Sequence, residues 1–170
     1  SMLGSPAHVV IGESWQKGLR DFDEEVLWEV AYGEARGTIP TNYGARPDVS
    51  VYDTYGYYPA DMFGSSVAWT QEVCVSDHAL ALMAQDLGSV GDAAFLEYRA
   101  HFWKNLYDPA SGWFHGRLSD GTWDTPPADN AWDEDYTEGN ARQYLWLVPH
   151  DPEGLFETLG GVDVALERLT

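Results

Sequence analysis

The sequence predicts an all-α fold in which long, aromatic-rich loops join the helices. Three observations support this. Residues that begin and end helices recur along the chain, and apolar residues repeat at helical spacing. No segment alternates apolar and polar residues convincingly, as a half-buried strand would. Helix pairs with loops gathered at one end are typical of half of a larger helical toroid, so we expect a partial toroid.

The first part of the chain predicts three helices. Ser5-Pro6 begins the first, which Gly18 ends, because Pro suits the first helical turn and Gly the residue after the last. Asp23 caps the second, which continues to about residue 37. One of its faces carries the apolar residues Val26, Leu27, Val30 and Ala31. Residues 38–64 are expected to be irregular, and a long helix is expected from residue 65 or 66 to residue 87.

The second part predicts further helices, about six in all. A helix over about residues 90–106 repeats Ala94, Phe95, Tyr98 and Phe102 at helical spacing. Residues 107–136 are expected to form loop or a short hairpin, and residues 137–148 a helix. Asp151-Pro152 begins the next helix, which Gly160-Gly161 ends. The last helix starts at about residue 162, and the sequence stops within it.

This ending predicts that residues 1–170 form a single fragment of a larger domain, because a natural domain rarely stops inside an amphipathic helix. We interpret Ser1-Met2 as a cloning scar. Exposed apolar helix faces are then expected, so the chain should associate with itself or with the remaining part of its protein.

Composition excludes several classes of function. The net charge of −19 makes nucleic-acid binding improbable and disfavours anionic membranes. It is compatible with neutral sugars or with cations. No apolar run reaches the roughly 18 residues that a membrane span needs. Cys74 is the single cysteine, so no disulfide forms within the chain.

An acidic segment is the first candidate for chemistry. Residues 129–138 carry five carboxylates and no basic residue. Such a segment can be solvated, can bind a cation, or can raise the pKa of one carboxyl group. The spacing does not fit an EF-hand calcium loop.

The other candidates have ordinary structural interpretations beside the functional one. Trp113, Trp123 and Trp132 are expected in loops, where they could face a sugar ring or simply pack. His150 stands at a helix start, where a capping role is the simpler interpretation. Cys74 lies inside a predicted helix and is expected to be a buried, inert thiol.

Several ordered motifs resemble glycoside hydrolase family ninety-two, the calcium-dependent exo-acting α-mannosidases. The most specific is YTEGNARQY at 136–144, followed by WLVPHD at 146–151 and GLFETLGG at 154–161. GYYPAD at 56–61, YRA at 98–100 and NLYDP at 105–109 also occur in the order of the family. The resemblance covers nearly the whole chain.

The long helix departs from the family. It reads TQEVCVSDH at 70–78, which keeps Thr70, Glu72 and Asp77 but lacks the tyrosine, one aspartate and the tryptophan of the usual pattern. The departure indicates a divergent member, with an altered subsite shape and linkage preference.

The resemblance implies the middle of an (α/α)6 catalytic domain from a bacterial α-mannosidase, with an N-terminal β-sandwich domain and a C-terminal remainder that this chain lacks. It implies inversion of the anomeric centre, mannose-containing glycans as partners, α-1,2-linked mannose as substrate, and a secreted or periplasmic location. In an inverting enzyme a carboxylic acid protonates the leaving oxygen, and a carboxylate about 6.5–9.5 Å away activates water.

The resemblance also assigns residues. The glutamate of the E-G-N motif is the general acid, which implies this role for Glu138. The residues implied to bind substrate are Asn140, Gln143, His150, Asp151, Glu72 and Asp77. The aspartates that act as base lie downstream of position 170 in the family, and most calcium ligands are expected outside this chain, so its metal-binding residues stay unassigned. The chain alone is therefore expected to be inactive.

Two alternatives remain open. A degenerate half-barrel could bind carbohydrate or a partner protein without catalysis, and another (α/α)6 hydrolase, such as a glucoamylase-like or trehalase-like enzyme, shares the architecture. The retained motif residues favour the mannosidase over the first alternative, and the order of the motifs favours it over the second.

Overall fold

The computed structural model describes residues 3–39, 46–125 and 128–169. In these ranges it contains eight α-helices, one 3-10 helix and a two-stranded hairpin. The α-helices are α1 (Pro6–Gln16), α2 (Glu24–Ala35), α3 (Val49–Tyr55), α4 (Ser66–Asp86), α5 (Val90–Ala100), α6 (Ala141–Tyr144), α7 (Pro152–Leu159) and α8 (Val162–Leu169). The other elements are η1 (Phe102–Leu106), β1 (Tyr107–Asp108) and β2 (Trp113–Phe114). The prediction of a mainly helical fold is confirmed, and the partial (α/α)6 toroid stays a prediction.

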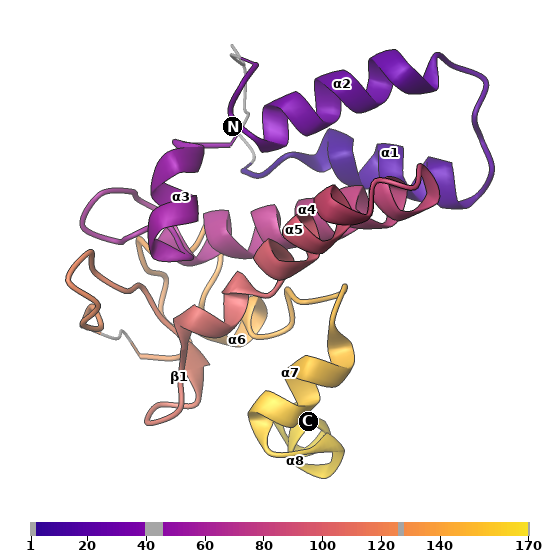
Figure 1. The fold of residues 1–170 in the computed structure, drawn as a ribbon. Coiled ribbons are helices and arrows are strands. Elements are labelled where there is room, and N and C mark those ends of the chain that lie inside the picture. The colour runs from indigo at the N-terminus through magenta and orange to yellow at the C-terminus, as the bar shows by residue number, and fades with distance from the viewer. Residues whose placement is uncertain (1–2, 40–45, 126–127, 170) are drawn as a thin grey trace.

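Helix α4 organises the fold. It packs along α1 and α5, while α6, α7, α8 and the hairpin lie below this layer in Figure 1. The contact with α1 is close because Gly12 faces Ala79, and a Cβ atom at Gly12 would lie 2.9 Å from the Ala79 Cβ atom. Most of α4 is buried, so it has no single apolar stripe and forms the core on several faces.

The predicted starts of α1, α2, α4 and α7 are confirmed within a residue. The Asp23 side chain accepts a hydrogen bond from Val26 N, and Asp151 accepts one from Gly154 N. These caps satisfy backbone N–H groups that have no partner within the helix. The expected hairpin within residues 107–136 is also present, with Tyr107 opposite Phe114 in an antiparallel pair.

The apolar faces predicted for α2 and α5 are only partly covered. On α2, Ala31 is buried but Val26 and Val30 are exposed. On α5, Tyr98 is exposed, and the buried positions include Leu96 and Arg99.

The expectation of irregular chain over residues 38–64 is wrong for residues 49–55, which form α3; residues 40–45 lie outside the described ranges. Asp48 caps α3 by accepting a hydrogen bond from Ser50 N, and Gly56 ends it in the left-handed conformation with φ 73°. Tyr52 is fully buried, and its hydroxyl donates to the Arg99 carbonyl at 3.2 Å. Tertiary packing therefore stabilises a helix that is too short to be evident from sequence periodicity.

The helix expected over residues 90–106 divides at His101. The His101 ring Nδ1 donates to the Glu97 carbonyl at 2.8 Å, and the His101 backbone N–H bonds to the Tyr98 carbonyl instead. The side chain thus takes the acceptor that a continuing α-helix would use, and the chain continues as η1.

The helix expected over residues 137–148 is wrong in extent, because only residues 141–144 are α-helical. Glu138 has φ 53°, and Asn140 is extended with φ −145°. Neither conformation belongs to an α-helix, so the helix begins after Asn140.

The core explains some of the aromatic residues and the cysteine. Trp15 and Trp103 are fully buried, whereas Trp132 is exposed and Trp113 and Trp123 are half-buried. Cys74 is buried beside the Tyr52 hydroxyl, and burial raises the pKa of its thiol to about 12. The prediction of an inert thiol is consistent with this environment.

Candidate active site

The acidic segment is anchored on the first turn of α4. Ser65 N donates to the Glu134 carbonyl at 2.6 Å, and the N–H groups of Val67 and Ala68 donate to the Asp135 carbonyl at 3.1 and 3.2 Å. The first N–H groups of a helix have no partner within it, so the loop carbonyls satisfy them. The start of α4 therefore fixes the segment that leads to Glu138.

Asp135 turns its side chain into the protein. Its carboxylate accepts hydrogen bonds from the Ser66 hydroxyl at 2.9 Å and from Gly116 N at 2.7 Å. Burial raises the pKa of Asp135, although these two hydrogen bonds favour its charged form. Asp135 thus connects α4, the chain after β2 and the acidic segment.

Two tyrosines hold the next turn. The Tyr136 hydroxyl donates to the Phe114 carbonyl at 2.5 Å. The Tyr144 hydroxyl donates to the Thr137 carbonyl at 2.7 Å and accepts a hydrogen bond from Thr137 N at 3.1 Å. Tyr144 therefore fixes both polar backbone groups of the residue that precedes Glu138.

Glu138 is exposed to solvent on a left-handed backbone with φ 53°. Only one other non-glycine residue in the described ranges has a positive φ, and it is Ser65, which anchors the same segment. A non-glycine residue in this conformation costs about 1–3 kcal/mol, and such residues cluster at functional sites. The surrounding hydrogen bonds maintain this conformation.

Asn140 and Gln143 cap α6 reciprocally. The Asn140 side chain accepts a hydrogen bond from Gln143 N at 3.2 Å, and the Gln143 side chain accepts one from Asn140 N at 3.1 Å. Both side chains thus fix the turn that carries Glu138. Their predicted contact with substrate stays a prediction.

Glu72 lies on α4, and its carboxylate packs close to Gly4, where a Cβ atom would lie 3.0 Å from Oε2. Its side chain is partly buried, and burial raises its pKa. The pKa of the Tyr144 hydroxyl is also raised, first by burial, with further contributions from the charges of Glu72 and Glu138. Gln71, the neighbour of Glu72, donates from Nε2 to the Tyr144 carbonyl at 3.0 Å. The charges of Glu72 and Glu138 therefore both act on the Tyr144 hydroxyl, and Gln71 ties α4 to the same residue.

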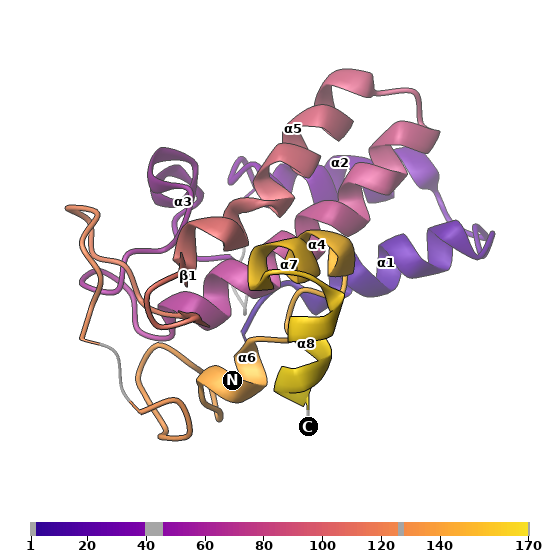
Figure 2. The same cartoon turned by 90° about the horizontal axis from the view of Figure 1, so that it is seen from below.

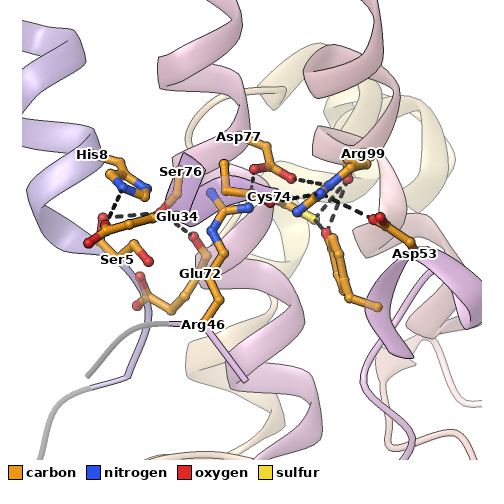
Figure 3. A network of polar contacts seen from close by, with 12 residues as sticks. Ser5, His8, Glu34, Arg46, Asp53, Glu72, Cys74, Ser76, Asp77 and Arg99 are labelled. Atoms are coloured by element: carbon orange, nitrogen blue, oxygen red, sulfur yellow. Dashed lines mark hydrogen bonds and ion pairs between the residues drawn. The ribbon is translucent and has the colours of Figure 1, made fainter. Parts of the chain in front are cut away.

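Asp77 lies elsewhere, between two buried arginines (Figure 3). One of its carboxylate oxygens bonds to Arg46, and the other accepts from Arg99 Nε at 2.8 Å. Arg99 also pairs with Asp53 at 3.1 Å and donates to the Ala35 carbonyl at 3.0 Å. This network joins the chain around α3 to α2, α4 and α5, and it gives Asp77 a structural role.

His150 and Asp151 form a third location. His150 Nε2 donates to the Ala100 carbonyl at 2.8 Å, and burial is the main cause of its lowered pKa. Asp151 caps α7 and lies 3.6 Å from Lys104 Nζ. These contacts connect the end of α5 and η1 with the start of α7, as expected for a capping role. Among the described residues, neither His150 nor Asp151 forms a hydrogen bond or ion pair with Glu138.

Two residues that hold the site, Tyr144 and Ser65, have no predicted role in it. Tyr144 is the last residue of the YTEGNARQY motif, so its place in the motif was an available signal. The left-handed backbone of Ser65 has no signal in the sequence.

Neither a metal site nor a membrane helix is evident in the described parts of the chain. No group of three or more His, Cys, Asp or Glu side chains there could hold a metal ion. Across residues 3–39, 46–125 and 128–169, no helix combines the length and apolar character needed to cross a bilayer.

Comparisons with known proteins define the class. The catalytic domain of glycosyl hydrolase family 92 matches residues 1–170, so the chain is part of a glycoside hydrolase catalytic domain. The chain belongs to glycosyl hydrolase family 92.

Solved structures of the family resemble the chain closely. An inverting mannosidase from Bacteroides thetaiotaomicron aligns with a TM-score of 0.93 and 28% identity, over 99% of this chain and 23% of that one. An α-mannosidase from the same organism aligns with a TM-score of 0.88 and 32% identity, over 99% of this chain and 22% of that one. A further family member, at 20% identity and a TM-score of 0.60, covers 85% of this chain and 21% of its own, and shows the fold alone. No curated protein sequence matches this chain.

Proposed function

We propose that this chain is part of an inverting exo-α-mannosidase that acts on mannose-containing glycans with α-1,2-linked mannose, with Glu138 as the general acid. The observation that carries the proposal is the placement of Glu138. It occupies the E-G-N position of the family motif, and its side chain is exposed on a left-handed backbone that Tyr144 and the Asn140–Gln143 cap hold in place.

The relatives support the choice of sugar. One structure with 28% identity is that of an inverting mannosidase, and an α-mannosidase with 31% identity was solved in complex with mannoimidazole. Since the chain spans 22–23% of the length of these relatives, the activity of the whole protein is proposed from family membership and from the site described above.

The role of Glu138 follows from the chemistry of inversion. The bond between the anomeric carbon and the leaving oxygen breaks as that oxygen takes the proton of Glu138, while a second carboxylate removes a proton from the attacking water. The family resemblance puts this second carboxylate downstream of position 170. An exposed Glu138 on a fixed turn is suited to meet a sugar that enters from solvent.

We also propose that the activity requires calcium and that the protein is secreted or periplasmic, both on the grounds of family resemblance. Calcium takes about 6–8 oxygen ligands. The described residues do not assemble such a set, so they do not fit the ion by themselves, and none of the steps above involves it.

Glu138→Gln in the full-length protein tests the assignment. Glutamine keeps the size of the side chain but has no proton to transfer. Mannosides with poor leaving groups should lose about 10²–10⁴-fold in kcat, whereas aryl mannosides with acidic phenols should lose much less. Hydrolysis rates on the two substrate classes, measured side by side, give the answer.

Glu134→Gln is the matched control, because Glu134 is also exposed and lies four residues earlier in the same acidic segment. It should leave both substrate classes unchanged. An equal loss on both classes for Glu138→Gln, with an unchanged melting temperature, would contradict the general-acid role and transfer it to Asp135 or Glu72.

A further inference from the structure

A pocket lies where α6, α8 and β2 come together. It has a volume of about 270 Å³, and its lining residues are Trp113, Asp129, Arg142, Trp146, Arg168 and Leu169. Figure 2 shows α6 and α8 on the same side of the molecule. We call the pocket lined by these six residues the fork pocket. Its volume is just below the range of about 300–1,000 Å³ that is usual for drug-sized ligands, so it suits one small ring.

The polar part of the fork pocket is an ion pair between Arg142 and Asp129, which does not use all of their hydrogen-bonding atoms. Arg142 Nε and Nη2 both donate to the same oxygen of Asp129, Oδ2, at 2.9 Å each. This arrangement leaves Arg142 Nη1 and Asp129 Oδ1 available for a ligand. A hydroxyl group both donates and accepts a hydrogen bond, so a donor beside an acceptor matches two adjacent hydroxyls.

The ion pair is held in position before any ligand binds. Arg142 N donates to the Asp129 carbonyl at 3.3 Å, and the Asn140 side chain donates to the Asn130 carbonyl at 3.4 Å. These contacts fix the loop against the first turn of α6. The Arg142 side chain is 61% exposed and that of Asp129 is 32% exposed, so both remain accessible.

The aromatic part supplies an apolar surface. Trp113 and Trp146 pack partly against the core and are partly exposed. The Arg168 guanidinium lies 4.1 Å from the centre of the Trp113 ring, which fixes that indole from one side. Indole rings offer flat apolar surface to the C–H faces of a pyranose ring.

We propose that the fork pocket binds an uncharged pyranose ring with adjacent hydroxyls, as a further sugar of the glycan whose terminal residue reaches Glu138. The proposal rests on the proposed function for the identity of the glycan. Arg142 lies four residues after Glu138, on the helix that Asn140 caps. The pocket and the Glu138 turn are therefore joined through the first turn of α6.

The test compares a long and a short substrate on the full-length protein. Arg142→Met removes the guanidinium but keeps most of the aliphatic chain. Loss of a hydrogen bond to a charged group should raise KM for a linear mannotriose about tenfold. KM for an aryl mannoside, which carries one sugar ring, should stay the same, as should kcat on that substrate.

Arg20→Met is the matched control. Arg20 pairs with Asp86 at 3.1 Å and lies 3.9 Å from the centre of the Trp15 ring, so it belongs to a similar cluster on another surface. Trp15 is fully buried there and offers no face to a sugar. Equal KM changes for Arg142→Met on both substrates, or the same change for Arg20→Met, would overturn the proposal.

The outcome stays separate from that of the proposed function. If the full-length protein cleaves neither substrate, calorimetric titration with mannotriose tests the fork pocket alone. Binding that weakens about tenfold in Arg142→Met but not in Arg20→Met supports it. No binding of mannotriose would overturn the proposal. Glucuronate that binds more tightly than mannose, and that no longer binds to Arg168→Met, would overturn it as well.

Discussion

At the scale of single residues, the acidic segment depends on a contact that only glycine permits. Gly116 donates its N–H to the Asp135 carboxylate at 2.7 Å, and a Cβ atom at Gly116 would lie 2.3 Å from both carboxylate oxygens. The Asp135 carboxylate would have to move away, although the Ser66 hydroxyl also holds it at 2.9 Å. The absence of a side chain at Gly116 therefore determines where Asp135, and the turn after it, can lie.

Gly116→Ala should accordingly destabilise the protein by about 1–3 kcal/mol, because the methyl group displaces the buried carboxylate. Chemical denaturation measures this as a lower midpoint. Gly91→Ala is the control: Gly91 lies in α5 with no atom near its Cβ position, so alanine should stabilise by about 0.5–1 kcal/mol. Unchanged stability of Gly116→Ala would contradict the close contact.

The residues predicted for the site divide according to how they could be recognised. Glu138, Asn140 and Gln143 are adjacent in sequence, so the motif alone placed them together. Glu72 joins them only through tertiary contacts of α4 with Tyr144. Asp77 belongs to the same predicted helix as Glu72, but residues five apart lie on different faces of an α-helix, and Asp77 faces the arginines. The five-residue spacing therefore indicates that the two acids face different ways, but it could not show that Arg46 and Arg99 would meet Asp77.

At the scale of elements, local signals succeeded at helix starts and failed inside the irregular regions. Capping residues, Pro in the first turn and Gly after the last turn act within a few residues of a helix end. The starts of α1, α2, α4 and α7 were therefore predictable. The short α3 depends on burial of Tyr52, and the break at His101 depends on one side-chain hydrogen bond. Neither leaves a periodic pattern in the sequence. Helix α6 is short because Glu138 has a left-handed backbone, and nothing in the sequence pattern indicates this conformation.

The buried Asp77 network makes a prediction about how the elements hold together. Asp77 is fully buried, and Asp77→Asn would leave Arg46 and Arg99 without their common charged partner. Breaking such a pair costs about 3–5 kcal/mol. The melting temperature should fall clearly for Asp77→Asn and little for Asp86→Asn, whose partner Arg20 is exposed.

The same pair of variants separates the structural role of Asp77 from its predicted role in substrate binding. A structural role lowers stability and reduces activity on all substrates through loss of folded protein. An Asp77→Asn protein with a normal melting temperature and a raised KM would instead support substrate binding and contradict a structural role.

At the scale of the whole molecule, two helices, α2 and α8, each expose several apolar side chains. Helix α8 buries Ala165 but exposes Val162, Val164, Leu166 and Leu169, and α2 exposes Val26 and Val30. A helix with this pattern is normally covered on its apolar face. The chain spans 23% of the length of its inverting mannosidase relative, and these two helices have the composition of contact surfaces.

We therefore predict that the isolated 170-residue chain associates with itself. Its net charge of −19 opposes association at low ionic strength, so added salt should increase the mass measured by light scattering. Replacing Leu166 and Leu169 with Gln should reduce the association, because both side chains are more than half exposed on α8 and contribute to the apolar face. Replacing the exposed Glu153 and Glu157 of α7 with Gln serves as the control, since it removes charge but no apolar surface and should not reduce the mass. A monomer at every salt concentration with a cooperative melting transition would contradict the prediction and show that these faces need no cover.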